Sequence, residues 1–225
     1  MAGQRGFLYE GRVFNKLKSK NLVPAGVTPA GADASRPDAI FLYNKAQYNL
    51  EVKLDLATDY GQGTLDYKNG AWELGGANTK QAVEMRKILT TVGAVKFANT
   101  SWGYQGAPNK GTVENKDITE EMVREDYRRF TDKFLSVPLS SLYNYYAAKN
   151  TYYIQIGGYG MYYMASNPGN LPVPKFNGAL RLRIRLKRGG STPIYNYRFT
   201  TALQVTQKPS RSKFDLDTDT NFLVA

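Results

Sequence analysis

Asp38, Glu51 and Lys53 have the types and spacing that best suit chemistry on a phosphate group. Asp38 precedes one short apolar run, and Glu51 and Lys53 alternate within the next run. Two facing carboxylates repel each other unless a cation lies between them, and Mg²⁺ binds a few carboxylates while it keeps water and phosphate oxygens as its other ligands. An ammonium group nearby can orient or deprotonate a water molecule, or stabilise the charge that develops at phosphorus. These residues therefore predict a Mg²⁺ site, with Mn²⁺ as a substitute.

A β-hairpin would bring the three side chains together. Strand-like runs at 39–43 and 47–54 flank a short polar segment. If residues 44–45 form a two-residue turn, the two carboxylates lie opposite each other, whereas a four-residue loop places Asp38 opposite Lys53. Side chains alternate between the faces of a strand, so the three residues share one face in both registers. The other face is almost wholly apolar and needs a core.

Glu10 is a further candidate for this site. Residues 5–20 predict a helix, and Glu10 lies between Phe7 and Phe14 on its apolar stripe. A buried carboxylate is costly unless it is paired or binds a metal. The alternative is a partly solvated Glu near the start of the helix, favoured by the helix dipole. The residues alone leave both interpretations open.

The order of these features resembles the PD-(D/E)XK nuclease superfamily, which includes restriction endonucleases, Holliday-junction resolvases and phage exonucleases. The resemblance covers roughly residues 3–65. It consists of a helix with a Glu, a loop, Pro37-Asp38 at the start of a strand, Glu51-Val52-Lys53 in the next strand, and a segment containing Gly61-Gln62. The alternative is a surface hairpin in which Lys53 pairs with a carboxylate.

The resemblance implies a role for each residue of the motif. Asp38 and Glu51 would bind Mg²⁺ with support from Glu10, Lys53 would act at the attacking water, and Gln62 would contact substrate or water. The implied fold is α/β (α+β): a restriction-endonuclease-like mixed β-sheet core flanked by helices, here with a β-rich basic C-terminal extension.

The amino-acid composition narrows the possible chemistry. The 225 residues include no His and no Cys. This excludes zinc fingers, disulfide frameworks, Ser-His-Asp triads and nucleases that use His. No apolar run approaches the ~18 residues of a membrane-spanning helix, and the N-terminus lacks an apolar signal sequence, so we expect a cytoplasmic protein without a membrane partner.

The charge is strongly uneven along the chain. The formal net charge is +11, and residues 133–214 contain twelve Lys and Arg but no Asp or Glu. Ten of the 17 tyrosines lie in the same stretch. A basic, aromatic-rich surface suits a polyanion such as DNA, because cations neutralise phosphates and planar groups stack on bases. The alternative is a soluble lobe that happens to be basic.

The run from Leu180 to Arg188 predicts a strand with a basic face. Leu180, Leu182, Ile184 and Leu186 alternate with cations. We expect the cations to contact DNA, although a solvated face of an edge strand has the same pattern. The expected DNA-binding residues are Arg181, Arg183, Arg185, Lys187 and Arg188, and, in a flexible Pro/Ser segment, Lys208, Arg211 and Lys213. Asp215, Asp217 and Asp219 are interpreted as a solvated acidic tail.

The sequence suggests three consecutive parts. These are a nuclease core with helical elaboration at 1–135, a basic, Tyr-rich β lobe at 136–214 that packs on or completes the core, and an acidic tail at 215–225. Further helices are expected at 79–92, 119–135 and 138–149, and strands at 151–156, 160–165, 179–188 and 194–206. The Gly-rich stretch 61–76 is expected to be a loop.

These expectations combine into a functional hypothesis. The chain would be a Mg²⁺-dependent endonuclease that hydrolyses double-stranded DNA at specific sites, of restriction or phage type, in a bacterial cell or a phage-infected host. Cleavage of both strands with one site per chain suggests a homodimer. The alternatives are a branched-DNA resolvase with the same core and a non-catalytic nucleic-acid-binding protein.

Overall fold

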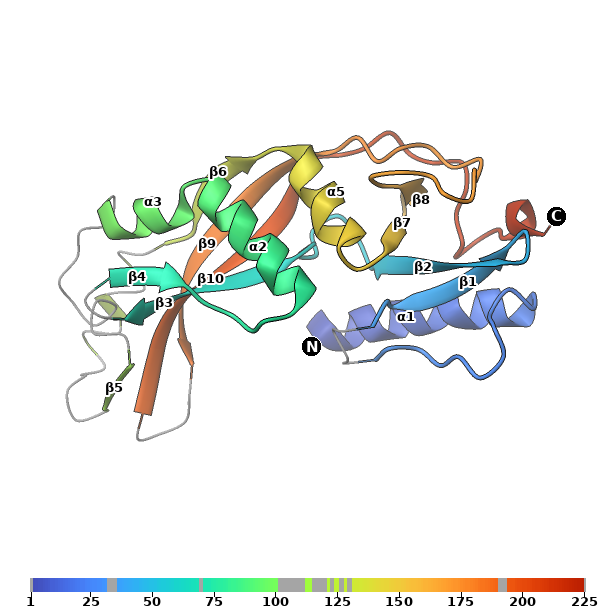
Figure 1. Cartoon of the computed structure of the whole chain (residues 1–225). Helices are drawn as coiled ribbons and strands as arrows, with labels where there is room; N and C mark the ends of the chain where they lie inside the picture. The colour runs from blue at the N-terminus through green and yellow to red at the C-terminus, as the bar shows by residue number, and fades with distance from the viewer. Residues whose placement is uncertain are drawn as a thin grey trace. The chain divides into compact units, whose positions relative to one another are not determined.

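The structure is a computed structural model that describes most of the chain. It covers residues 2–31, 36–68, 71–100, 112–114, 131–189 and 194–224, together with residues 121, 124, 125 and 128. Helices combine with one four-stranded and one six-stranded sheet in this part of the chain, which confirms a mixed α/β (α+β) class (Figure 1). No helix in the described ranges is long and apolar enough to cross a bilayer.

The helices within these ranges are α1 (Ala2–Ser19), α2 (Lys80–Thr91), α3 (Ala94–Thr100) and α5 (Leu139–Ala147), with the 3₁₀ helix η3 (Asn221–Leu223) near the C-terminus. The strands are β1 (Ala39–Tyr43), β2 (Ala46–Lys53), β3 (Gln62–Lys68), β4 (Ala71–Leu74), β5 (Thr112–Glu114), β6 (Lys133–Val137), β7 (Thr151–Ile156), β8 (Gly160–Tyr163), β9 (Ala179–Gly189) and β10 (Ile194–Gln207).

Two predictions of secondary structure need correction. The expected loop at 61–76 contains β3 and β4, which pair with each other. The expected helix at 119–135 lies mostly outside the described residues, and its end is wrong because residues 133–135 belong to β6. β6 pairs with β9, so sheet pairing outweighs the local helical pattern there.

The chain forms two compact units. Unit 1 consists of Met1–Tyr60, Pro138–Ala179 and Val205–Ala225, and unit 2 of Gly61–Val137 and Leu180–Gln204. Each unit is assembled from separate stretches of the chain. The units therefore differ from the consecutive parts expected from the sequence.

Unit 1 contains the four-stranded sheet, in the order β1-β2-β7-β8. β1 and β2 form an antiparallel hairpin, and β7 adds to β2 in parallel. Helix α1 runs along β1 and β2 (Figure 1) and buries Tyr9, Val13 and Leu17 in the core of this unit. Helix α5 leads directly into β7, and its Tyr146 is buried next to Glu51.

The β1–β2 turn fixes the register of the hairpin. Asn44 and Lys45 have φ values of 47° and 63°, as the two central residues of a type I′ turn require. Ala39 consequently pairs with Leu50, so the next position along the hairpin places Asp38 opposite Glu51. The register predicted for a two-residue turn is confirmed.

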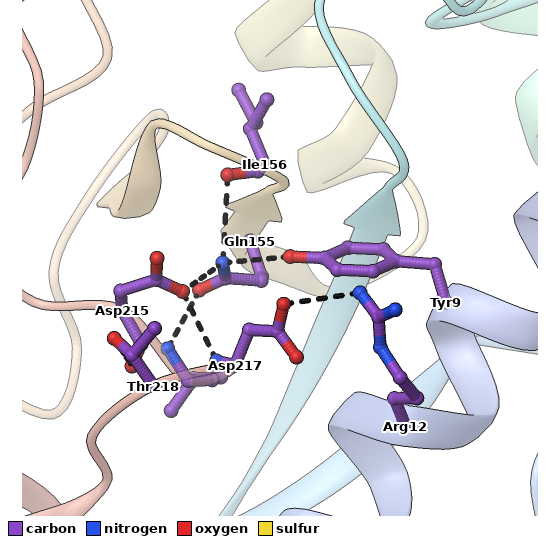
Figure 2. Close-up of polar contacts among 8 residues, drawn as sticks. Tyr9, Arg12, Gln155, Ile156, Asp215, Asp217 and Thr218 are labelled. Carbon is purple, nitrogen blue, oxygen red and sulfur yellow. Dashed lines mark hydrogen bonds and ion pairs between the residues drawn. The ribbon is translucent and has the colours of Figure 1, made fainter.

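The C-terminal segment is packed into unit 1. Gln155 of β7 is completely buried: its Nε2 donates to the Tyr9 hydroxyl at 3.0 Å and to Asp215 Oδ1 at 2.7 Å, and its Oε1 accepts from the Leu216 amide at 3.0 Å (Figure 2). Arg12 of α1 pairs with Asp217 at 3.1 Å. The interpretation of this segment as a solvated tail is therefore wrong for Asp215 and Asp217, which tie it to β7 and α1, whereas Asp219 is exposed.

Unit 2 contains the six-stranded sheet. Its strand order is β4-β3-β10-β9-β6, and β5 pairs with β10. Helix α2 contacts β3 and helix α3 contacts β4 (Figure 1). The alternation predicted for β9 is confirmed, because its apolar residues are all buried: Leu180, Leu182, Ile184 and Leu186.

Gly157 provides a test of the packing at the end of β2. Its amide donates to the Lys53 carbonyl at 2.9 Å, and a Cβ atom there would overlap the Leu54 carbonyl oxygen and lie 3.3 Å from the Tyr9 ring. We expect Gly157→Ala to lower the free energy of unfolding by about 1–3 kcal/mol, as overpacking does. Urea unfolding measures the change.

Gly6→Ala is the matched control, because nothing lies within 4 Å of a Cβ atom at this helical position. It should stabilise the protein by about 0.5–1 kcal/mol through helix propensity. Equal effects of the two substitutions would contradict the close contact at Gly157.

Candidate active site

Glu51 is the centre of the candidate site. Strand β2 directs Glu51 and Lys53 to the same face, and the Lys53 Nζ lies 2.6 Å from Glu51 Oε1. Lys149, which follows α5, places its Nζ 3.0 Å from Glu51 Oε2. The side chain of Glu51 is only 6% exposed, and those of Lys53 and Lys149 are 17% and 11% exposed. A buried carboxylate thus has one ammonium group on each oxygen.

A tyrosine hydroxyl closes the site on the α5 side. Tyr146 is buried, and its hydroxyl lies 2.7 Å from the Tyr60 carbonyl and 3.3 Å from Glu51 Oε1. The single hydroxyl proton favours the shorter contact. Glu51 therefore depends mainly on the two lysines for its stabilisation.

Asp38, immediately before β1, faces this group. Its Oδ2 accepts a hydrogen bond of 2.7 Å from the Val52 amide. Burial and the negative charge of Glu51 raise the pKa of Asp38 to about 7, against the opposing effect of Lys53. The carboxylate of Asp38 is therefore poorly compensated in the protein as it stands.

Glu10 belongs to the same electrostatic cluster. Burial raises the pKa of Glu10, the charge of Lys53 lowers it and the charge of Glu51 raises it further. The structure thus places Glu10 within the electrostatic field of the hairpin pair. Glu10 is only partly buried and lies in the middle of α1 rather than in its first turn, so its role at the site stays a prediction.

The protonation states follow from these neighbours. Burial alone would raise the pKa of Glu51, but the two ammonium groups outweigh burial and lower it. Burial alone would lower the pKa of Lys53, but Glu51 and Asp38 raise it above its ordinary value. Lys53 is consequently an ammonium group at neutral pH, and it is better suited to orienting water or stabilising anionic oxygen than to removing a proton.

The donor set fits a hard divalent cation. Mg²⁺ typically uses one or two protein carboxylates and keeps several waters. Asp38, just before β1, and Glu51 of β2 supply two carboxylates, and the pKa of Asp38 is raised first by burial and then by the charge of Glu51. In the part of the chain that the structure describes, no three acidic side chains converge closely enough to enclose a metal without rearrangement.

The structure brings four of the five expected residues of the motif into one cluster: Glu10, Asp38, Glu51 and Lys53. Gln62 is exposed on β3 and belongs to unit 2. Sequence reasoning missed the site contacts of Lys149 and Tyr146, which lie three residues apart in the chain. The sequence signal for these contacts is a Lys three residues after a Tyr, at the end of an expected helix. A Lys at the end of a helix is also favoured by the helix dipole, so the same pattern occurs without a site.

The basic face of β9 has partners of its own in unit 2. The Arg181 guanidinium lies 3.7 Å from the centre of the Phe134 ring, and its Nε donates to Gln204 Oε1 at 3.3 Å. Arg185 makes two hydrogen bonds to Asp132, at 2.7 and 2.6 Å. Arg185 therefore has an acidic partner from outside the stretch that lacks Asp and Glu. Lys187 is exposed, and the side chain of Arg188 lies outside the described residues.

A second group of expected DNA contacts belongs to unit 1. Lys208, Arg211 and Lys213 are all exposed. Their segment is anchored, because Arg211 Nε donates to the Gly158 carbonyl at 2.9 Å and the Ser212 amide donates to the Tyr159 carbonyl at 2.9 Å. The expectation of a flexible segment is corrected: the three cations project from backbone that is held against the β7–β8 turn.

Comparisons with known proteins add no evidence on this site. No protein-family model, curated protein or solved structure matches the chain.

Asp38→Asn should make the protein more stable at high pH. The native pKa of Asp38, about 7, exceeds its unfolded value, so the native state holds an extra proton between about pH 4 and 7 and loses stability as the pH rises through this window. Asn cannot ionise, and it can still accept from the Val52 amide. In EDTA we expect the variant to be more stable than the wild type by about 1–3 kcal/mol at pH 8, with little difference near pH 4.

The measurement is urea unfolding of both proteins at several pH values. Asp219→Asn, at an exposed carboxylate, is the control and should show no such pH-dependent gain. A variant less stable than the wild type at pH 8 would contradict a poorly compensated charge on Asp38.

Proposed function

We propose that the chain is a Mg²⁺-dependent DNA endonuclease, site-specific and of restriction or phage type, with its catalytic site in unit 1. The observation that carries the proposal is the pairing of Asp38 and Glu51 across the hairpin, with Lys53 held at 2.6 Å from Glu51 Oε1. The cluster has three carboxylates, Glu10, Asp38 and Glu51, for two ammonium groups, so one carboxylate is left without a cation. An excess of carboxylate is expected for a cation site.

Each residue has a role in this proposal. Asp38 and Glu51 would hold Mg²⁺, with Glu10 supporting the negative potential of the site. When bound, the ion would lower the pKa of a bound water and neutralise phosphate charge. Lys53 keeps its proton, orients the attacking water and stabilises the anionic oxygens of the phosphate as charge builds.

The packing around Glu51 supports a preorganised site. Tyr146 bonds to the Tyr60 carbonyl, the type I′ turn fixes the strand register, and the Val52 amide holds Asp38 Oδ2. These contacts fix the backbone that carries the two carboxylates, so the rearrangement that cation binding requires is confined to the lysine ammonium groups on Glu51.

DNA binding is the second part of the proposal. Lys208, Arg211 and Lys213 are exposed in the same compact unit as the carboxylates, and their segment is fixed by backbone hydrogen bonds. The cations of β9 add positive charge in unit 2. Phosphate contacts of this kind supply most of the sequence-independent affinity for DNA. Cleavage of both strands would then use two chains, as a homodimer.

Glu51→Gln should abolish cleavage and preserve DNA binding. The substitution removes the charge that holds the cation but changes little in shape. With supercoiled plasmid we expect the wild type to nick in Mg²⁺ or Mn²⁺ and not in EDTA, and the variant to lose at least a thousandfold in rate. Both proteins should bind duplex DNA in Ca²⁺, whose looser coordination positions the water poorly.

Glu73→Gln is the matched control, at an exposed glutamate of β4 in unit 2, and it should cleave at the wild-type rate. Near wild-type nicking by Glu51→Gln in Mg²⁺ would contradict the assignment of the site. Discrete fragments from a long linear duplex would support site-specific cleavage, whereas preferential cutting of a four-way junction would point to a resolvase.

Two triple variants test where DNA binds. Replacing Lys208, Arg211 and Lys213 with Gln should lower the slope of log affinity against log salt by about 0.9 for each phosphate that the variant no longer neutralises. Replacing Arg181, Arg183 and Arg185 with Gln should lower the slope less, since Arg185 already pairs with Asp132.

Titrations against one duplex at several salt concentrations measure both slopes. The fold should survive in both variants, because the buried face of β9 and the Ser212–Tyr159 backbone bond remain, although Arg211→Gln removes the Arg211–Gly158 bond. Unchanged slopes in both variants would mean that DNA binds elsewhere.

A further inference from the structure

Lys149 is the second cation on Glu51, and it lies outside the motif that suggested the site. It comes from the junction of α5 and β7, 98 residues after Glu51 in the chain, and its Nζ lies 3.0 Å from Glu51 Oε2. Glu51 Oε1 is occupied in the same way by Lys53. A divalent cation that binds Glu51 must therefore share the carboxylate with two ammonium groups, and their positive charges oppose its binding.

The backbone of Lys149 is fixed from both neighbouring strands. Its carbonyl accepts from Asn49 Nδ2 at 3.3 Å and from Thr151 Oγ1 at 3.4 Å. Asn150 adopts a left-handed conformation, with φ 54°, that ends the helix at this point. The Lys149 ammonium also lies 5.6 Å from the centre of the Tyr146 ring. The chain thus holds this ammonium group at the carboxylate from a fixed base.

The formal charges of the cluster favour a single divalent cation. Glu10, Asp38 and Glu51 contribute three negative charges when ionised, and Lys53 and Lys149 contribute two positive charges, which leaves one negative charge. One divalent cation makes the cluster singly positive, which matches one phosphodiester group. A second divalent cation would leave a large positive excess in a mostly buried site, which is costly.

We propose that Lys149 is an internal counter-cation that competes with a divalent ion for Glu51 and limits the site to one such ion. This inference rests on the proposed function, which assigns the cation to Asp38 and Glu51. It adds that one divalent ion binds per site and that Lys149 opposes its binding. A purely structural Lys149 would stabilise the fold without opposing the metal.

Calcium binding to the intact chain tests the inference without turnover. By calorimetry, we expect the wild type to bind one Ca²⁺ per chain and Lys149→Met to bind Ca²⁺ at least tenfold more tightly. The melting temperature of Lys149→Met should be lower in EDTA, because Glu51 has one partner fewer, and should rise more on adding Ca²⁺ than that of the wild type. Lys149→Arg keeps the charge and should resemble the wild type.

Lys175→Met is the matched control. Lys175 also lies over a tyrosine of α5, 5.0 Å from the centre of the Tyr143 ring, but it is exposed. It should leave Ca²⁺ affinity unchanged. Equal or weaker Ca²⁺ binding by folded Lys149→Met would overturn the inference, as would two Ca²⁺ ions per wild-type chain.

A second measurement uses the wild type alone, in case Lys149→Met folds poorly. Ca²⁺ should displace the Lys149 ammonium, so its labelling by an amine-reactive reagent, followed by mass spectrometry, should accelerate when Ca²⁺ is added. An unchanged labelling rate at saturating Ca²⁺ would overturn the inference. Failure of the wild type to cleave DNA in Mg²⁺, with these Ca²⁺ results as expected, would instead overturn only the proposed function.

Discussion

The electrostatics of the candidate site depend on the buried carboxylate of Glu51, which two ammonium groups keep ionised. An isolated charge in the interior costs several kcal/mol, so it persists only with partners on both oxygens. Lys53 supplies one partner from the same strand, and Lys149 supplies the other from the start of the adjacent parallel strand. Removing either lysine would leave a charge that the surrounding apolar core cannot solvate.

Several separate stretches of the chain supply the residues around this carboxylate. The hairpin supplies Asp38, Glu51 and Lys53, helix α5 brings Tyr146 and Lys149 to the same face, and α1 covers the other face while placing Glu10 within the field of the cluster. The C-terminal segment fixes α1 through Gln155 and Arg12 (Figure 2). A site that combines one carboxylate kept ionised with another kept close to neutral is typical of a place where charge changes during function.

The sequence was most informative where local patterns determine geometry. The two-residue turn at Asn44-Lys45 and the alternation along β2 were enough to predict that Asp38 faces Glu51, and the alternation of β9 was enough to predict its buried face. Contacts between residues far apart in the chain could not be predicted from local patterns. Lys149 meets Glu51 only because β7 adds to β2 in parallel, and Asp132 pairs with Arg185 although it lies just outside the acid-free stretch. The glycines of 61–76 suggested a loop, although the stretch contains β3 and β4. Gly63 of β3 has a packing reason, because a Cβ atom there would collide with Met85.

The central claim is that Asp38 and Glu51 bind a divalent cation. Anomalous diffraction from crystals soaked in Mn²⁺ tests it most directly, because the signal locates the ion without assumptions about activity. The account predicts one anomalous peak per chain, within bonding distance of an oxygen of each carboxylate, and movement of the Lys149 ammonium away from Glu51. A peak elsewhere, or none at saturating Mn²⁺ with Glu51 still held by both lysines, would contradict it.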